Sequence, residues 1–412
     1  MINRLLKHGA LFVLAKSIVL IAPLFAAYLL DKSSYGLFEW SLSIAMIIST
    51  VITLGAGNTI AFEKVKNEQS ALIYIGQTYS VYLSFILAFL SIIIAIFFHE
   101  VSIVLVLGMS SFFVVQYALS AYMKASGLGA RASIIDSGIY IVLLILLMLA
   151  LFQEDSKLPY VVSFSIFAMI LGVFLNSTID RTTTVTKNEI RKFLKRGFPI
   201  MLSGGMVIFF FNLPKMLLGS ESMVLVGEFS LYFRWAAMAL VVYQFIIVMF
   251  FRDLYTKSYP DFDKFIASIS LGIYILGFFI LTFLYLANAY EVKYLPLPDL
   301  DISVQVLMIA IIALWTLTAS LEGLLYREDK SIHQLWANLL GIIIFLIIYN
   351  FHQDDKDTIY LITSSWLISF AAIIFYQLFI IHKFILKAKF TFINSFFVLI
   401  LVITIFLSEI KV

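Results

Sequence analysis

Long apolar runs, each bounded by charged or turn-forming residues, recur along the whole chain and constrain its fold more than any other feature. A helix needs about 20 apolar residues to cross the hydrocarbon core of a bilayer, and most of the runs have this length. They predict twelve membrane-spanning helices, near residues 9–30, 37–60, 72–98, 101–123, 132–152, 160–180, 197–218, 226–250, 265–290, 302–324, 335–350 and 360–382. A final run at 390–407 predicts a thirteenth helix.

The composition supports this prediction and excludes other classes of protein. Of the 412 residues, 62% are hydrophobic and 13% are charged, which leaves too little polar surface for a soluble globule. Cysteine is absent and the five histidines are scattered, so we expect no metal site, no cofactor and no catalytic residue. The net charge of +3 is small and the basic residues lie between apolar runs, which argues against nucleic acid as a partner. The sequence predicts an all-α polytopic membrane protein that is a transporter and not an enzyme.

The basic residues predict how the chain is oriented. When the connections are assigned alternately to two sides, one side holds 20 Lys and Arg residues and the other side holds 5. Cytoplasmic connections carry the excess of Lys and Arg, so this bias predicts a cytoplasmic N-terminus.

Two similar halves are predicted. The most basic segment, 181–196, separates an N-terminal half at 1–180 from a C-terminal half at 197–382, and residues 383–412 form a basic loop and the extra helix. A short turn followed by a glycine and an acidic residue opens the second helix of each half, with Gly36 and Glu39 in one and Gly227 and Glu228 in the other. Such a repeat predicts two six-helix halves, related by an axis along the membrane normal, around a central cleft.

Several short motifs resemble those of one transporter family. Residues 9–60 are similar to the opening of the Wzx-type O-antigen and polysaccharide flippases, which belong to the multidrug/oligosaccharidyl-lipid/polysaccharide (MOP) exporter superfamily. In the second half, residues 215–236 are similar to the turn between helices 7 and 8 of the same family. The chain has Asn212, Leu213 and Pro214 where family members often carry an acidic residue. The motifs that carry the resemblance are Tyr35-Gly36, Leu54-Gly55, the basic Lys64 and Lys66, and Gly197-Phe198-Pro199.

The resemblance implies a function and a setting. Flippases of this family move an undecaprenyl-diphosphate-linked oligosaccharide, such as an O-antigen repeat unit, from the cytoplasmic to the periplasmic leaflet of the bacterial inner membrane. It further implies alternating access, and a polysaccharide polymerase and a chain-length regulator as partners in lipopolysaccharide or polysaccharide biosynthesis. Two alternatives remain open: a multidrug or cation antiporter of the same superfamily, which would need an anionic cavity, and a membrane-embedded polysaccharide polymerase, which would need an outward loop longer than 291–301.

Three cations lie inside or at the edge of predicted spans. Charged groups at bilayer depth are costly, so they usually face a water-filled cavity or a partner. We expect Lys16 and Arg234 to face each other across the cleft, and Lys215 to extend toward the interface. The resemblance implies that cations on helices 1, 2 and 8 hold the diphosphate, although helix 2 of this chain carries no cation. Lys16, Arg234 and Lys215 are the candidate diphosphate-binding set. For Lys16 and Arg234, internal ion pairs with Glu39, Asp136 or Glu228 are the alternative.

Four acids share this setting and are candidates for ion coupling or gating. Burial disfavours the charged form of a carboxylate and a nearby cation favours it, which can create a reversible proton or Na⁺ site. Asp136 is expected to be the deepest, while Glu39 and Glu228 are expected at the outward ends of equivalent helices. Glu322 is expected near the cytoplasmic end of its helix.

Overall fold

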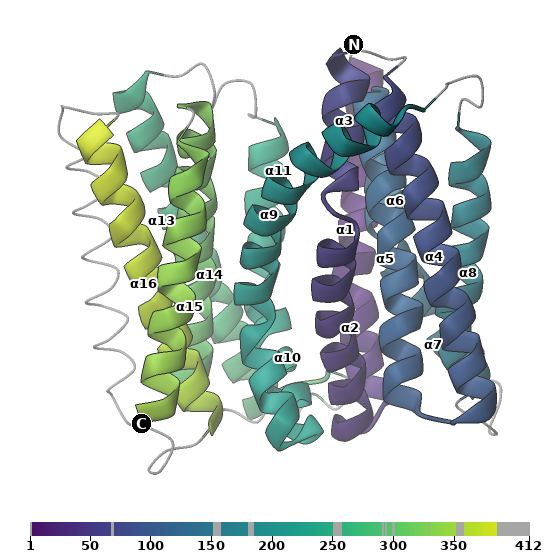
Figure 1. Cartoon of the computed structure of the whole chain (residues 1–412). Coiled ribbons are helices and arrows are strands. Elements are labelled where there is room, and N and C mark those ends of the chain that lie inside the picture. Colours follow the sequence, from purple (N-terminus) through teal and green to yellow (C-terminus); the bar gives the residue numbers. More distant parts are fainter. Residues whose placement is uncertain are drawn as a thin grey trace. The chain divides into compact units, whose positions relative to one another are not determined.

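The computed structural model describes most of the chain, namely residues 2–66, 70–150, 158–179, 185–249, 258–290, 292, 295–298, 301–328, 330–351 and 358–384. Over these residues the regular structure is helical throughout (Figure 1). The helices are α1 (Ile2–Leu29), α2 (Lys32–Ile52), α3 (Ala56–Lys66), α4 (Ala71–Phe97), α5 (Val101–Ala125), α6 (Gly129–Asp136), α7 (Gly138–Ala150), α8 (Leu158–Ser177), α9 (Lys187–Glu221), α10 (Met223–Ala236), α11 (Met238–Met249), α13 (Tyr259–Ala289), α14 (Ile302–Arg327), α15 (Ser331–Phe351) and α16 (Thr358–Phe384).

The helices confirm the predicted all-α polytopic membrane fold. Within the described residues, nine helices are long and apolar enough to cross a membrane, and the bent pair of α10 and α11 adds a tenth candidate. Two shorter apolar helices lie at Gly138–Leu149 and Val162–Ser177. Together these correspond one to one to the twelve predicted spans. The predicted thirteenth helix at 390–407 lies outside the described residues.

Three spans that the sequence predicts as single helices are interrupted, so those predictions were wrong in detail. The span at 37–60 divides between α2 and α3, where Leu54 and Gly55 have positive φ values of 50° and 70°. The span at 132–152 divides between α6 and α7 at Ser137. The span at 226–250 bends by 44° between α10 and α11. Hydropathy does not detect such breaks because the residues on both sides remain apolar.

Side chains from neighbouring helices satisfy the backbone at the two breaks in the first part of the chain. The Tyr79 hydroxyl on α4 donates to the carbonyl of Ile52, at 2.6 Å, where α2 ends. The Ser137 hydroxyl donates to the carbonyl of Ser133, at 3.0 Å, and to that of Ala15 on α1, at 2.9 Å. A free carbonyl would be costly in the membrane, so these bonds stabilise the breaks.

The basic segment that was predicted as a linker is largely helical. α9 begins at Lys187, ten residues before the predicted span, and continues without interruption for 35 residues. Thr186 and Glu189 form a capping box that satisfies backbone N–H groups at its start. The division into six-helix halves itself stays a prediction.

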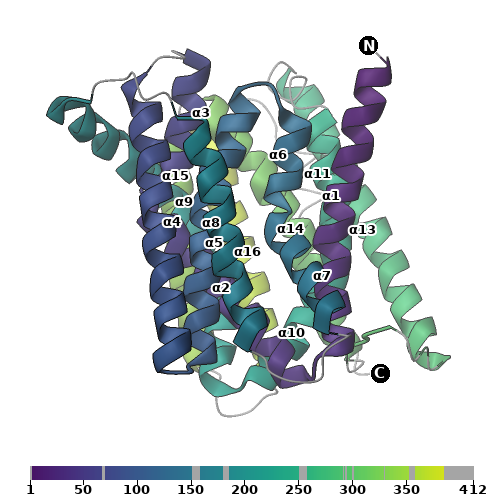
Figure 2. The same ribbon diagram turned by 90° about the vertical axis from the view of Figure 1, so that its right-hand side faces the viewer.

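The chain forms two compact units, which meet in sequence at Gly227 and Glu228. In the first unit, α5 packs against α2, α4 and α8, while α1 packs along α6 and α7 (Figures 1 and 2). Its core contains Ile60, Val115 and Leu119, which are fully buried. α9 belongs to this unit and packs along α2.

In the second unit, α16 packs against both α14 and α15. Buried amide side chains join these three helices. Gln377 on α16 donates to Gln334 on α15, at 2.6 Å, and to the carbonyl of Thr318 on α14, at 3.2 Å. Interhelical hydrogen bonds of this kind hold helices together where apolar surfaces give little preference for one partner.

Candidate functional site

A buried ion pair joins α2 to α9 in the first unit. The Nζ of Lys215 lies 2.6 Å from Oε2 of Glu39, and the hydroxyl of Tyr35 donates to the other carboxylate oxygen at 3.1 Å. Glu39 is 0% exposed and Lys215 is 7% exposed. Two oppositely charged groups in such a place neutralise each other and avoid the much larger cost of one buried charge.

This pair corrects two expectations. Lys215 does not extend to the membrane interface, because its ammonium group is buried against Glu39. Glu39 does not sit at the end of its helix, because α2 begins at Lys32, which puts Glu39 in the second turn, where it is fully buried. A salt bridge at this depth holds α2 and α9 in one register.

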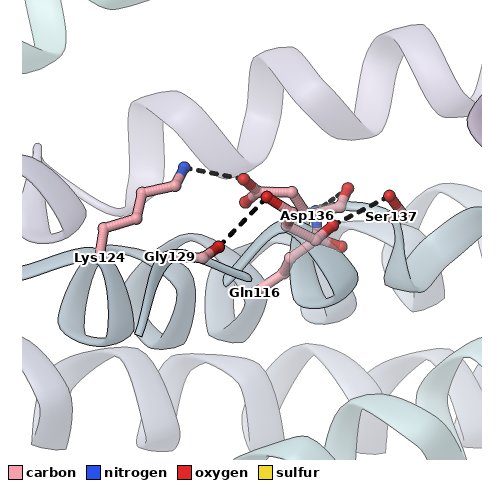
Figure 3. A network of polar contacts seen from close by, with 6 residues as sticks. Gln116, Lys124, Gly129, Asp136 and Ser137 are labelled. Carbon is pink, nitrogen blue, oxygen red and sulfur yellow. Dashed lines mark hydrogen bonds and ion pairs between the residues drawn. The ribbon is translucent and has the colours of Figure 1, made fainter. Parts of the chain in front are cut away.

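A second polar cluster lies where α5 ends and α6 meets α7 (Figure 3). The Nζ of Lys124 is 2.8 Å from a carboxylate oxygen of Asp136, and the amide of Gln116 donates to the Asp136 carbonyl at 3.1 Å. The side chains of Asp136 and Lys124 are 33% and 56% exposed. Asp136 is thus more exposed than Glu39, and its expected depth in the membrane stays a prediction.

Lys16 on α1 belongs to this cluster. It is partly buried, with its Nζ 5.8 Å from the centre of the Phe12 ring, and the charges that act on it are those of Asp136 and Lys124. The neighbouring Ala15 carbonyl accepts the hydrogen bond from Ser137 that ties α1 to the α6–α7 break. Two cations thus accompany one carboxylate, which leaves a net positive charge. We name Lys16, Lys124 and Asp136 the lysine cluster.

Sequence reasoning missed Lys124 as a site residue because it counted Lys124 only as an orienting charge. The sequence feature that could have identified Lys124 is the short connection after α5. Residues 126–128 reverse the chain there and bring α6 back along α5. That reversal runs α6 antiparallel to α5, so Asp136 at the end of α6 lies beside Gln116, where the Lys124 side chain reaches it.

The other predicted site residues lie in the second unit. Arg234, near the end of α10, is 8% exposed, while Glu228 and Glu322 are partly buried. Two residues before Glu322, the hydroxyl of Ser320 on α14 shares a hydrogen bond of 3.0 Å with the hydroxyl of Tyr243 on α11. The predicted pairing of Lys16 with Arg234 involves two different units, and it stays a prediction.

The glycines of the repeated motif meet within the first unit. A Cβ added to Gly36 would lie 1.7 Å from the carbonyl oxygen of Met223 and 2.9 Å from the nitrogen of Gly227. One added to Gly227 would lie 2.4 Å from the carbonyl oxygen of Lys32. The start of α2 therefore packs backbone to backbone against residues 223–227, which only glycine permits.

Aromatic residues of α10 pack in the core of the second unit. Phe233 stacks on Trp315 with ring centres 6.2 Å apart, and Phe229 lies 6.0 Å from Trp366, whose side chain is almost completely buried. Within the described residues, no group of three His, Asp or Glu side chains could hold a metal ion.

No family model matches the sequence, and no curated protein matches it. Solved structures do. A MATE protein in a bent conformation matches with a TM-score of 0.60 and 11% identity, and 96% of each chain is covered. An inward-facing multidrug resistance MATE family transporter of the MOP superfamily matches with a TM-score of 0.57 and 13% identity over 90% of this chain and 93% of that chain.

A third similar structure is a MOP superfamily transporter from Pyrococcus furiosus, described as having a binding pocket of reversed polarity that suggests a different function. It matches with a TM-score of 0.51 and 12% identity, and 91% of each chain is covered. The arrangement of the helices thus agrees with one known architecture over at least 90% of this chain. The chain has the fold of the transporters of the MOP superfamily.

Proposed function

We propose that this protein is a membrane transporter that flips a polyprenyl-diphosphate-linked oligosaccharide, such as an O-antigen or similar repeat unit, from the cytoplasmic to the periplasmic leaflet of a bacterial inner membrane. The fold supports transport, and the motifs of the first half support this substrate class. A polysaccharide polymerase and a chain-length regulator are the proposed partners.

The lysine cluster carries the proposal. Lys124 pairs with Asp136, and Lys16 on α1 lies within reach of the charges of both, so the cluster has one more positive than negative charge where α1 meets the α6–α7 break. A site for drug cations would need the opposite sign. A diphosphate carries more negative charge than Asp136 and offers more acceptor oxygens, so it competes well for both ammonium groups.

The proposed cycle is one of alternating access. The diphosphate takes the place of the Asp136 carboxylate beside Lys16 and Lys124, and the released carboxylate is then free to bind a proton or Na⁺. Ion coupling is assigned in this way to Asp136, with Glu39, Glu228 and Glu322 as further coupling or gating residues. Arg234 and Lys215 are proposed as additional diphosphate contacts, and for Lys215 this requires that its pair with Glu39 opens.

The test replaces the lysines without adding bulk. Lys16→Met and Lys124→Met should each lower surface polysaccharide about tenfold and cause lipid-linked precursor to accumulate, because each removes a charge-assisted contact with the diphosphate. Lys264→Met is the matched control, since Lys264 is exposed on α13 in the other unit. Normal export by Lys16→Met at wild-type protein levels would contradict the proposed site.

A multidrug antiporter is the second candidate, because similar solved structures include a multidrug resistance transporter. Such a protein would protect cells from cationic dyes, and Asp136→Asn would abolish that protection. The flippase proposal instead expects no change in dye resistance when the gene is deleted. The similar structure whose pocket has reversed polarity supports the view that this fold accepts more than one sign of charge.

A further inference from the structure

A pocket of about 210 Å³ lies among α10, α13 and α14 of the second unit and has no part in the proposed cycle. Two tyrosines, Tyr232 and Tyr285, and several aliphatic side chains form most of its wall. Sites for whole drug-sized molecules occupy about 300–1,000 Å³. This pocket therefore suits one part of a larger molecule, and its apolar wall suits a hydrocarbon part.

One polar side chain in the wall has no partner among the described residues. Gln305 is 4% exposed and lines the pocket, and neither its Nε2 nor its Oε1 makes a hydrogen bond with any residue that the structure describes. Nearly all buried polar groups in proteins are paired, because an unpaired one keeps its full desolvation cost. A bound molecule with one hydrogen-bonding group beside an apolar chain would satisfy this amide.

The depth of Gln305 indicates what kind of group that is. Asp301 caps α14 by accepting from the backbone N–H of Ser303 at 2.8 Å, and it marks the end of the connection from α13. Gln305 follows four residues later, about 6 Å farther along the helix axis. The interfacial layer of a bilayer is about 5–7 Å thick on each side. With the helix-capping Asp301 at the water-facing edge of this layer, the amide would lie at the level where the polar groups of a lipid join its chains.

The residues around the pocket also indicate the charge of the bound group and the route by which the molecule enters the pocket. Asp301 lines the pocket and the described lining residues include no cation, so a negatively charged group is disfavoured there. Thr282 and Tyr285 are exposed on α13, which is long and apolar enough to cross the membrane, so the pocket opens on a membrane-spanning helix. We propose that this pocket binds a lipid acyl chain, with an uncharged ester carbonyl or hydroxyl group hydrogen-bonded to Gln305.

The experiment uses the full-length protein in lipid nanodiscs with two photoactivatable probes, a phosphatidylcholine and a monoacylglycerol, each with a diazirine on its acyl chain. Mass spectrometry then maps the labelled residues. We expect labels on α13 and α14 around the pocket. Gln305→Leu should lower this labelling about fivefold, the factor that corresponds to one ordinary hydrogen bond. Thr282→Trp should abolish it by filling the entrance.

Leu271→Trp is the matched control, because Leu271 is 48% exposed on the same helix and does not line the pocket. It should leave labelling unchanged. Labelling by the phosphatidylcholine identifies a bilayer lipid as the occupant, and labelling by the monoacylglycerol alone identifies a free neutral lipid. Label spread evenly over α13 in the wild type, or equal labelling of Gln305→Leu and wild type, would overturn the proposal. The experiment is independent of polysaccharide export, so either proposal can fail alone.

Discussion

Glu39 and Lys215 are the residues whose environment departs most from what their types suggest. Both are almost completely buried, yet each supplies the counter-charge of the other, and Tyr35 occupies the remaining carboxylate oxygen. A buried pair of this kind adds little net stability compared with apolar residues of the same size. Its main effect is that the loss of either partner alone strongly lowers the free energy of unfolding.

Removing one charge of the pair should therefore lower the free energy of unfolding more than removing both charges. We expect Glu39→Gln to lower the free energy of unfolding by about 3–5 kcal/mol, because it removes the carboxylate that neutralises the buried ammonium group of Lys215. The double variant Glu39→Gln with Lys215→Met should recover most of that loss. Thermal unfolding of the purified protein in detergent measures both effects.

The more exposed pair of Arg327 and Glu328 is the control for this prediction. Its atoms lie 3.1 Å apart with side chains 23% and 27% exposed, so Glu328→Gln should change stability by less than about 1 kcal/mol. Equal losses for Glu39→Gln and Glu328→Gln would mean that the buried pair is not specially coupled.

The sequence identified most of the charged residues of the site but not their partners. Lys16, Lys215, Asp136 and Glu39 stand out because a charge inside an apolar run is rare. The pairing of Lys215 with Glu39 could not be predicted, since the two are 176 residues apart and no local spacing connects them. Lys124 was overlooked because charges at span ends ordinarily orient the chain and do nothing else.

At the scale of the helices, close backbone contacts decide where the elements can lie. Gly197 on α9 packs directly against the break between α2 and α3, and a Cβ there would lie 2.0 Å from the carbonyl oxygen of Leu54. Gly55 makes the reciprocal contact, 2.7 Å from the carbonyl oxygen of Gly197. Hydropathy predicted the helices well because each must cover a bilayer with apolar side chains. It missed the breaks because they depend on contacts with other helices.

Two glycine substitutions in α9 should therefore have opposite effects. Gly197→Ala should lower the free energy of unfolding by about 1–3 kcal/mol, since α9 must move away from Leu54. Gly204→Ala should raise it by about 0.5–1 kcal/mol, because a Cβ at Gly204 meets nothing within 4 Å and alanine favours the helix. Thermal unfolding compares the two directly, and destabilisation by both variants would contradict this account of the contact.

At the scale of the whole molecule, orientation is the property that the charge bias predicts and that experiment can measure most directly. The chain contains no cysteine, so a single introduced cysteine reports its own side of the membrane. Glu100, between α4 and α5, and Lys192, on α9, are both exposed. The charge bias places them on opposite sides.

We expect Glu100→Cys to react with a membrane-impermeant maleimide in intact spheroplasts. Lys192→Cys should react only after the membrane is permeabilised. The reverse pattern would mean that the N-terminus faces outward. Reaction of both residues in intact spheroplasts would contradict the three predicted spans between them, because an odd number of crossings places the two residues on opposite sides.

The uninterrupted length of α9 has a mechanical consequence for the first unit. Its 35 residues extend about 52 Å, well beyond the ~30 Å of the hydrocarbon core. It is held at two distant points, by Glu63 through Arg196 near its start and by Glu39 through Lys215 near its end. α9 is thus joined to its neighbours by ion pairs at two separate points, and Pro199, which cannot donate a backbone hydrogen bond, lies close to the first of them. A tilt of α9 relative to α2 and α3 would have to break at least one of these two ion pairs, so α9 and its two neighbours are expected to move together.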